Sequence, residues 1–236
     1  MARGFDATDG VGSTDAIATT YTANATTQSW SIWVYRTGDS VSGNGRLWQK
    51  VSTGYRAFYE DVGTNKYTLE ISWTTAGLWT IARPSASAWH HILITYDGSS
   101  TANDPIIYVD GSSVTVTRSV APTGSLITGS GAYYIGNENA GIRVWNGRLA
   151  EFGVWSRILS SGEATTLNGG FTPSCLPSGL VAYWPIQGTA SPEPELVAAA
   201  NGTLTGTAAQ THPTVKQPEQ HLFGHLGRLI QGRIAA

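Results

Sequence analysis

Short runs of Trp, Tyr, Ile, Val and Thr recur between clusters of Gly, Ser, Asn and Asp along the first 206 residues. β-branched and aromatic side chains suit a pleated, half-buried surface, whereas small polar residues favour turns, so this pattern predicts an all-β sandwich. One strand is predicted over residues 28–36, where both faces carry large apolar side chains. One face holds Trp30, Ile32 and Val34, and the other holds Trp33 and Tyr35. Such a strand is either central or has a functional concave face.

A hairpin is predicted where residues 106–109 and 114–116 flank the pair Asp110-Gly111. Asp-Gly is favoured where a tight turn needs positive φ, and β-branched residues lie on both sides of it. Another strand is predicted over residues 88–96. Further strands are predicted near residues 46–51, 55–60, 66–73, 77–82, 132–136, 144–155, 179–185 and 202–206.

One short helix is predicted after Leu159. Ser160 precedes Glu163 by three residues, which is the spacing of a capping box. The pair Gly169-Gly170 is expected to end the helix.

The composition changes after Thr207, which predicts a jelly-roll domain over 1–207 and a linker with a docking segment over 208–236. Residues 208–219 contain two prolines and few apolar side chains. Apolar residues then recur at helical spacing: Leu222, Phe223, Leu226, Leu229, Ile230 and Ile234. Each of three glycines in this segment costs a helix about 1 kcal/mol relative to Ala, so an isolated helix is marginal. We expect an external partner to order the segment; the alternative is docking on its own domain.

The composition excludes several classes of protein. Charged residues are 13% of the 236 residues, and the net charge of −2 argues against a nucleic-acid binder. No apolar run approaches the roughly 18 residues of a membrane span. The single Cys175 cannot form an internal disulfide, and the N-terminal residues lack the apolar stretch of a signal peptide. The sequence therefore predicts synthesis in a cytoplasm without signal-directed export.

A series of short motifs follows in a fixed order between residues 5 and 206. They occupy residues 5–10, 30–35, 89–98, 107–111, 134–137, 147–160, 180–185 and 201–204. The most specific is WHHI at 89–92, which leads to TYDG at 95–98. In this order the chain resembles the laminin-G-like, concanavalin-A-like lectin/glucanase jelly-roll superfamily. The resemblance implies two packed antiparallel sheets, and a lectin, adhesion or structural role of the kind found in phage and bacterial surface proteins.

Catalysis is not predicted, because glycoside hydrolysis needs two carboxylates on either side of the scissile bond. Neither Glu70 nor Glu151 has an acidic neighbour on its own strand face. Two acids from different strands remain an alternative, and they would make the chain a hydrolase of this fold. His90 and His91 are adjacent and cannot share a strand face, so no zinc site is expected. One of them is expected to be buried and hydrogen-bonded.

A ligand site is predicted in the loop that follows residue 136, because it combines amides, charges and an aromatic ring. The candidate residues are Asn137, Glu138, Asn139, Arg143 and Trp145. Aromatic residues that could line a neighbouring face are Trp48, Tyr55, Tyr59, Trp73 and Trp79. Core packing is the alternative role for any one tryptophan.

No cofactor is predicted, with calcium as an alternative that the resemblance implies. Its candidate oxygen donors, which do not define a ligand set, are Asp6, Asp9, Asp97, Asn103, Asp104, Asn137 and Asn139. These types are also common turn residues.

The favoured function is a non-enzymatic structural or decorating protein of a phage-like virion, made in the cytoplasm and displayed on the particle surface. Its partners would be other virion or surface-assembly proteins that bind the C-terminal segment. A homo-oligomer and a glycan ligand are both compatible with the sequence. The alternative is a carbohydrate-binding lectin or adhesin, followed by a glycoside hydrolase.

Overall fold

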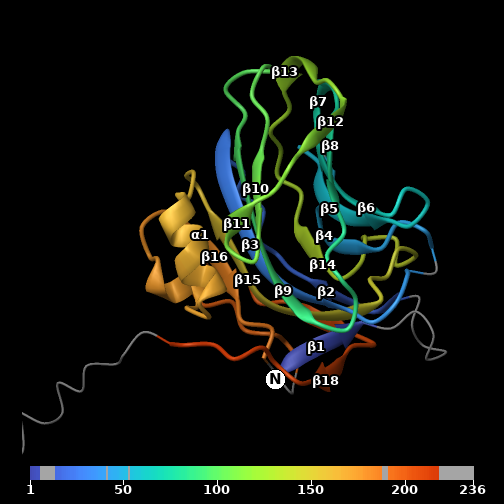
Figure 1. The fold of residues 1–236 in the computed structure, drawn as a ribbon. Coiled ribbons are helices and arrows are strands. Elements are labelled where there is room, and N and C mark those ends of the chain that lie inside the picture. Colours follow the sequence, from blue (N-terminus) through green and yellow to red (C-terminus); the bar gives the residue numbers. More distant parts are fainter. Residues whose placement is uncertain (6–13, 41, 53, 188–190, 218–236) are drawn as a thin grey trace, which may run out of the picture.

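The computed structural model describes residues 1–5, 14–40, 42–52, 54–187 and 191–217. Two eight-stranded antiparallel sheets pack face to face (Figure 1). Sheet A contains, in spatial order, β11 (Ser112–Ser113), β10 (Ile106–Val109), β9 (Trp89–Asp97), β3 (Thr27–Arg36), β15 (Gly147–Trp155), β1 (Ala2–Phe5) and β18 (Ala208–Gln210), with β16 (Leu180–Trp184) also paired to β15. Sheet B contains, in spatial order, β12 (Thr117–Val120), β8 (Gly77–Ala82), β6 (Lys66–Ile71), β5 (Arg56–Asp61), β4 (Arg46–Lys50), β14 (Tyr133–Ile135), β2 (Ala16–Ala18) and β17 (Thr203–Thr205). A separate pair joins β7 (Trp73–Thr75) to β13 (Thr123–Leu126). The predicted two-sheet jelly-roll sandwich is confirmed.

Aromatic side chains fill the space between the sheets. The expected alternation of β3 is confirmed, since Trp30, Ile32 and Val34 are buried while Trp33 and Tyr35 on the other face are half-buried. Trp30 of sheet A stacks on Trp48 of sheet B, with ring centroids 5.2 Å apart. Large buried rings supply much of the apolar area that stabilises a sandwich without disulfides.

The predicted hairpin forms, with β10 antiparallel to β11. Asp110 and Gly111 have φ values of 51° and 79°, the positive region that this tight turn requires. The return strand is Ser112–Ser113, which is earlier than the predicted 114–116.

The two described helices pack on sheet A. α1 (Ser161–Asn168) begins with the predicted capping box, in which Ser160 and Glu163 each accept a hydrogen bond from the backbone N–H of the other. With Leu159, it covers the outer face of sheet A at Leu93, Tyr108 and Trp155, as Figure 1 shows for α1 beside β10 and β11. The 3₁₀ helix η2 (Pro173–Cys175) packs against β15 and β16. In the described part of the chain, the outer face of sheet B thus has no helix over it. Neither helix is long and apolar enough to cross a membrane.

The structure differs from the sequence expectation at residue 208, where a linker was predicted to begin. Residues 208–210 form β18, which pairs with β1. Further along, the backbone N–H of Lys216 donates to the carbonyl of Gly170, and its carbonyl accepts from Thr172. Residues 208–217 are therefore part of the sandwich, because they satisfy the backbone groups of an edge strand and of the turn after α1. The predicted docking residues Leu222 to Ile234 lie outside the described residues.

Candidate functional site

The outer face of sheet B carries two rows of side chains that run across its strands. Residues directly opposite each other in a ladder share a face, and Phe58, Leu69 and Trp79 point into the core. The residues next to them along each strand therefore point outward. One row is Gln49, Ala57, Glu70 and Leu78, and the other is Arg46, Tyr59, Thr68 and Thr80.

Arg46 holds the ring of Tyr59 in place. The Arg46 guanidinium carbon lies 4.2 Å from the centroid of the Tyr59 ring, and Nε of Arg46 donates to Oε1 of Gln49 at 3.1 Å. Arg46 is only 4% exposed, so the cation is fixed beneath a half-buried aromatic ring. This is a rigid platform on a sheet face over which no described helix packs.

Tyr55, Glu70 and Arg143 surround this platform with polar groups. Burial raises the pKa of Tyr55 to about 12, and the charges of Arg46, Glu70 and Arg143 all act on its hydroxyl. Burial also raises the pKa of Glu70, against the lowering effect of Arg46 and Arg143. These four charged and phenolic groups therefore lie near enough to influence one another electrostatically. They offer hydrogen-bond donors and acceptors beside an aromatic ring, a combination that suits a polyhydroxylated ligand.

The loop over 137–143 supplies Arg143. Asn137 is 0% exposed, and its Oδ1 accepts from the backbone N–H groups of Glu138 and Arg143 at 2.8 and 2.9 Å. The Arg143 guanidinium pairs with Glu138 at 3.3 Å, and its side chain is 39% exposed. Asn139 is exposed. Of the predicted ligand residues, Arg143 and Glu138 thus lie at this face, while Asn137 shapes the loop.

The prediction that Trp145 contributes to a ligand site is wrong. Its side chain is 0% exposed and meets Tyr67 edge-on in the core, with ring centroids 6.0 Å apart. Trp48, Trp73 and Trp79 are also core residues, and of the aromatic residues proposed for a face only Tyr55 and Tyr59 lie on the surface. The large apolar area of tryptophan favours burial over a place at the rim.

The two acids considered for hydrolysis lie on different sheets. Glu151 of β15 is 1% exposed, accepts hydrogen bonds from the Tyr183 hydroxyl and from Nε2 of Gln187, and lies 3.1 Å from Nε2 of His212. Glu70 is on the opposite sheet. This separation does not provide the paired carboxylates that glycoside hydrolysis requires.

The histidines have structural contacts. His91 is buried and its Nε2 lies 2.8 Å from Oγ of Ser31, as expected for one of the pair. His90 is held between Asp110 at 2.7 Å and Ser85 at 2.9 Å.

The described residues contain no group of three or more His, Cys, Asp or Glu that could hold a metal ion. Among the candidate calcium donors, Asp97 accepts from the backbone of Ser99, while Asp104 accepts from Trp79 and Arg118. Asp6 and Asp9 lie outside the described residues.

Comparison with protein families finds a match to the concanavalin A-like lectin/glucanases superfamily over residues 8–165. The chain belongs to this superfamily. No curated protein matches the chain.

A candidate carbohydrate-binding protein from Bacteroides ovatus is similar in structure, with a TM-score of 0.65, 18% identity, and coverage of 91% of this chain and 61% of that one. The heptameric SAP-like pentraxin from Limulus polyphemus has a TM-score of 0.54 and 15% identity, over 71% of this chain and 81% of that one. At these identities the likeness shows the shared fold.

The sequence did not identify Arg46 and Glu70 as neighbours of the two tyrosines. For Tyr59 and Glu70 the available signal was the alternation within residues 56–61 and 66–71. Arg46 had no such signal, because only the irregularity between Arg46 and Trp48 places it on the same face as Gln49.

Proposed function

We propose that this chain is a non-enzymatic carbohydrate-binding module that holds a saccharide on the outer face of sheet B. The observation that carries the proposal is the cluster of Tyr55, Tyr59, Arg46, Glu70 and Arg143 on a sheet face that no helix among the described residues covers. The lectin-like superfamily and the fold shared with a candidate carbohydrate-binding protein support it.

In this proposal the Tyr59 ring stacks on the apolar face of a sugar ring, because Arg46 keeps it from rotating away. Arg143 donates to ring hydroxyls or acetal oxygens, and Glu70 accepts from hydroxyls. Glu138 orients Arg143 through their ion pair and leaves part of the guanidinium exposed. A rigid platform reduces the entropy lost on binding.

A glycan-array screen of the full-length chain, with calcium and with EDTA, tests this function. We expect specific binding to at least one saccharide class, and the comparison of the two conditions decides whether calcium takes part. For the best ligand, Tyr59→Ala should weaken binding by roughly fivefold, which corresponds to about 1 kcal/mol for an aromatic contact. Arg143→Gln should weaken it similarly.

Arg118→Gln is the matched control. Arg118, like Arg143, is a partly exposed arginine in one ion pair, but it lies at the edge strand β12 and pairs with Asp104 at 2.6 Å. Its replacement should leave the affinity unchanged. Equal losses of saccharide affinity in Arg143→Gln and Arg118→Gln would contradict binding at this face. So would an array without any specific signal.

The second proposed role is decoration of a phage-like particle through the apolar C-terminal segment. Its support is the spacing of Leu222, Phe223, Leu226, Leu229, Ile230 and Ile234 after a proline-containing stretch. Here the partners are virion or surface-assembly proteins.

Removal of residues 218–236 tests this role. The truncated chain should remain folded, because it keeps β18 and the contacts of Lys216. Gradient-purified particles from cells that produce either form should carry the full chain and lack the truncated one. Equal incorporation of both forms would rule out the segment as the anchor.

A further inference from the structure

Three aromatic side chains lie together on the outer face of sheet A, on the part that α1 does not cover. Tyr35 pairs with Trp89 across the ladder and meets it edge-on, with ring centroids 5.6 Å apart. Trp33 lies on the same face of β3, 5.3 Å from the ring of His91. Trp33 and Trp89 are half-buried, whereas the other seven tryptophans are at most 5% exposed. The accessible indole surface of the molecule is therefore concentrated here. We call Trp33, Tyr35 and Trp89 the sheet A aromatic patch.

Arg148 extends this patch along the sheet. It pairs with Tyr35 in the β15–β3 ladder, and its guanidinium carbon lies 4.5 Å from the Tyr35 ring centroid. Its Nη1 donates to Oγ1 of Thr211 at 2.5 Å. Among the described residues, no carboxylate lies within 4.0 Å of this guanidinium. A planar guanidinium that is held in place and lacks an internal counter-ion is suited to a carboxylate on a ligand.

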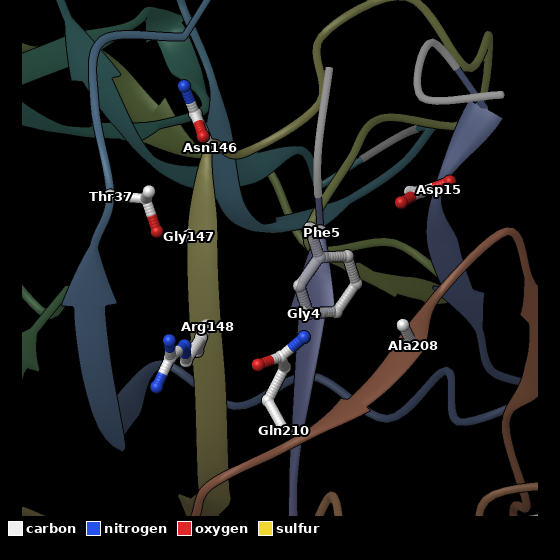
Figure 2. Close-up of a pocket in the computed structure, with 9 residues that line it drawn as sticks. All are labelled: Gly4, Phe5, Asp15, Thr37, Asn146, Gly147, Arg148, Ala208 and Gln210. Atoms are coloured by element: carbon white, nitrogen blue, oxygen red, sulfur yellow. The ribbon is translucent and has the colours of Figure 1, made fainter. Parts of the chain in front are cut away.

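A cavity of about 220 Å³ lies beside Arg148, where β15, β1 and β18 adjoin (Figure 2). Gln210 forms one wall. Its side chain packs directly on Gly4, where an added Cβ would lie 2.8 Å from Cγ of Gln210. Thr37 and Asn146 add polar groups on the side of Arg148, while Asp15 lies on the other side of Phe5 (Figure 2). The cavity is smaller than the roughly 300–1,000 Å³ of pockets for drug-sized ligands, so it suits a single ring-sized group.

We infer that the sheet A aromatic patch and this cavity form a second saccharide site, which takes an acidic sugar such as a uronic or sialic acid. Arg148 pairs with the sugar carboxylate at the cavity, where Gln210, Thr37 and Asn146 are available to the hydroxyls. The neighbouring residues of the glycan stack on Tyr35 and Trp89. The site lies on the opposite sheet from Tyr59 and Arg143, so it goes beyond the proposed function and can succeed or fail independently of it.

The test is calorimetric titration of the full-length chain with three carboxylated probes: tri-galacturonate, a hyaluronan tetrasaccharide and 3′-sialyllactose. Each is paired with a probe that lacks the charge, namely its methyl ester. We expect at least one acid to bind at least tenfold more tightly than its ester. Arg148→Gln should remove this difference, and Trp89→Ala should weaken the acid and the ester alike.

The matched control is Arg118→Gln at the edge strand β12, which should leave the affinity for the acid unchanged. Since Trp89 is half-buried, circular dichroism of both sheet A variants establishes that they fold. Arg148→Lys is a second variant that keeps the charge without the planar fork, and it should recover only part of the preference. The inference is overturned if no acid binds better than its ester, or if folded Arg148→Gln keeps the preference. Loss of binding in Tyr59→Ala but not in Arg148→Gln would assign the acid to sheet B instead.

Discussion

At the scale of single residues, the interior contains cations as well as rings. Arg56 is 0% exposed and donates to Oε1 of Gln28 and to the carbonyl of Ala25, while its guanidinium carbon lies 5.6 Å from the Trp30 ring centroid. Burial lowers its pKa. Removal of such a group would leave buried acceptors without donors, which destabilises more than the loss of an exposed contact. The alternation of β5 does not distinguish this inward arginine from a surface one.

His91 makes stability depend on pH. Burial lowers its pKa to about 3, against the opposing negative charge of Asp110, whereas an unfolded histidine titrates near 6.5. Below about pH 6.5 the unfolded state binds a proton at His91 that the folded state does not bind. The free energy of unfolding should therefore fall as the pH decreases from 6.5 towards 3. Urea titrations at several pH values should show this slope in the native chain.

The His91→Gln variant should lose most of that slope, even if it is less stable at every pH. The half-buried His90, held at the surface by Asp110 and Ser85, provides the control in His90→Gln. An unchanged slope in His91→Gln would show that His91 does not control the acid sensitivity.

Trp145 and Tyr59 show why the sequence does not determine which aromatic residues reach the surface. Both are aromatic and both lie near polar residues along the chain, so residue type does not separate them. Trp145 is buried because the chain leaves the loop at Val144 and enters the core before β15 begins. Tyr59 faces outward because Phe58 occupies the inward position beside it. Arg143 is 39% exposed, in keeping with the rule that charged groups rarely enter a core unpaired, and its role in ligand binding stays a prediction.

At the scale of elements, the cap of α1 is a clear local signal with a measurable effect. Ser160→Ala removes the side-chain acceptor for the N–H of Glu163 and should destabilise the protein by about 1 kcal/mol. The exposed neighbour Ser161 provides the control in Ser161→Ala, which keeps the capping box. Thermal unfolding of both variants measures the difference. Equal melting temperatures would contradict the role of the cap.

Other elements depended on distant partners and were not predictable locally. The hairpin and α1 were predicted because Asp110-Gly111 and the capping box act over a few residues. β18 has the unremarkable sequence AAQ, and it is a strand because β1 offers it an unpaired edge. The predicted linker was wrong over residues 208–210 for that reason. Proline content and low hydrophobicity are properties of the segment itself, whereas strand pairing depends on the free edge of β1.

At the scale of the whole molecule, the two outer faces differ. α1 covers part of sheet A and leaves the sheet A aromatic patch accessible, while neither helix of the described chain lies over the polar cluster of sheet B. The sandwich was predictable because its motifs follow one another in order along the chain. The cluster of Arg46, Tyr59 and Glu70 was not, since it depends on the register of three strands and on the irregularity between Arg46 and Trp48 in the β4–β5 ladder.

The most direct test of saccharide binding at sheet B is a map of backbone amide shifts in the ¹⁵N-labelled chain during titration with the best array ligand. The account predicts shifts concentrated in β4, β5, β6 and the loop over 137–143, and their loss in Tyr59→Ala. Shifts confined to sheet A or to the rest of the surface would contradict the placement of the site. The absence of any saturable shift would contradict carbohydrate binding itself.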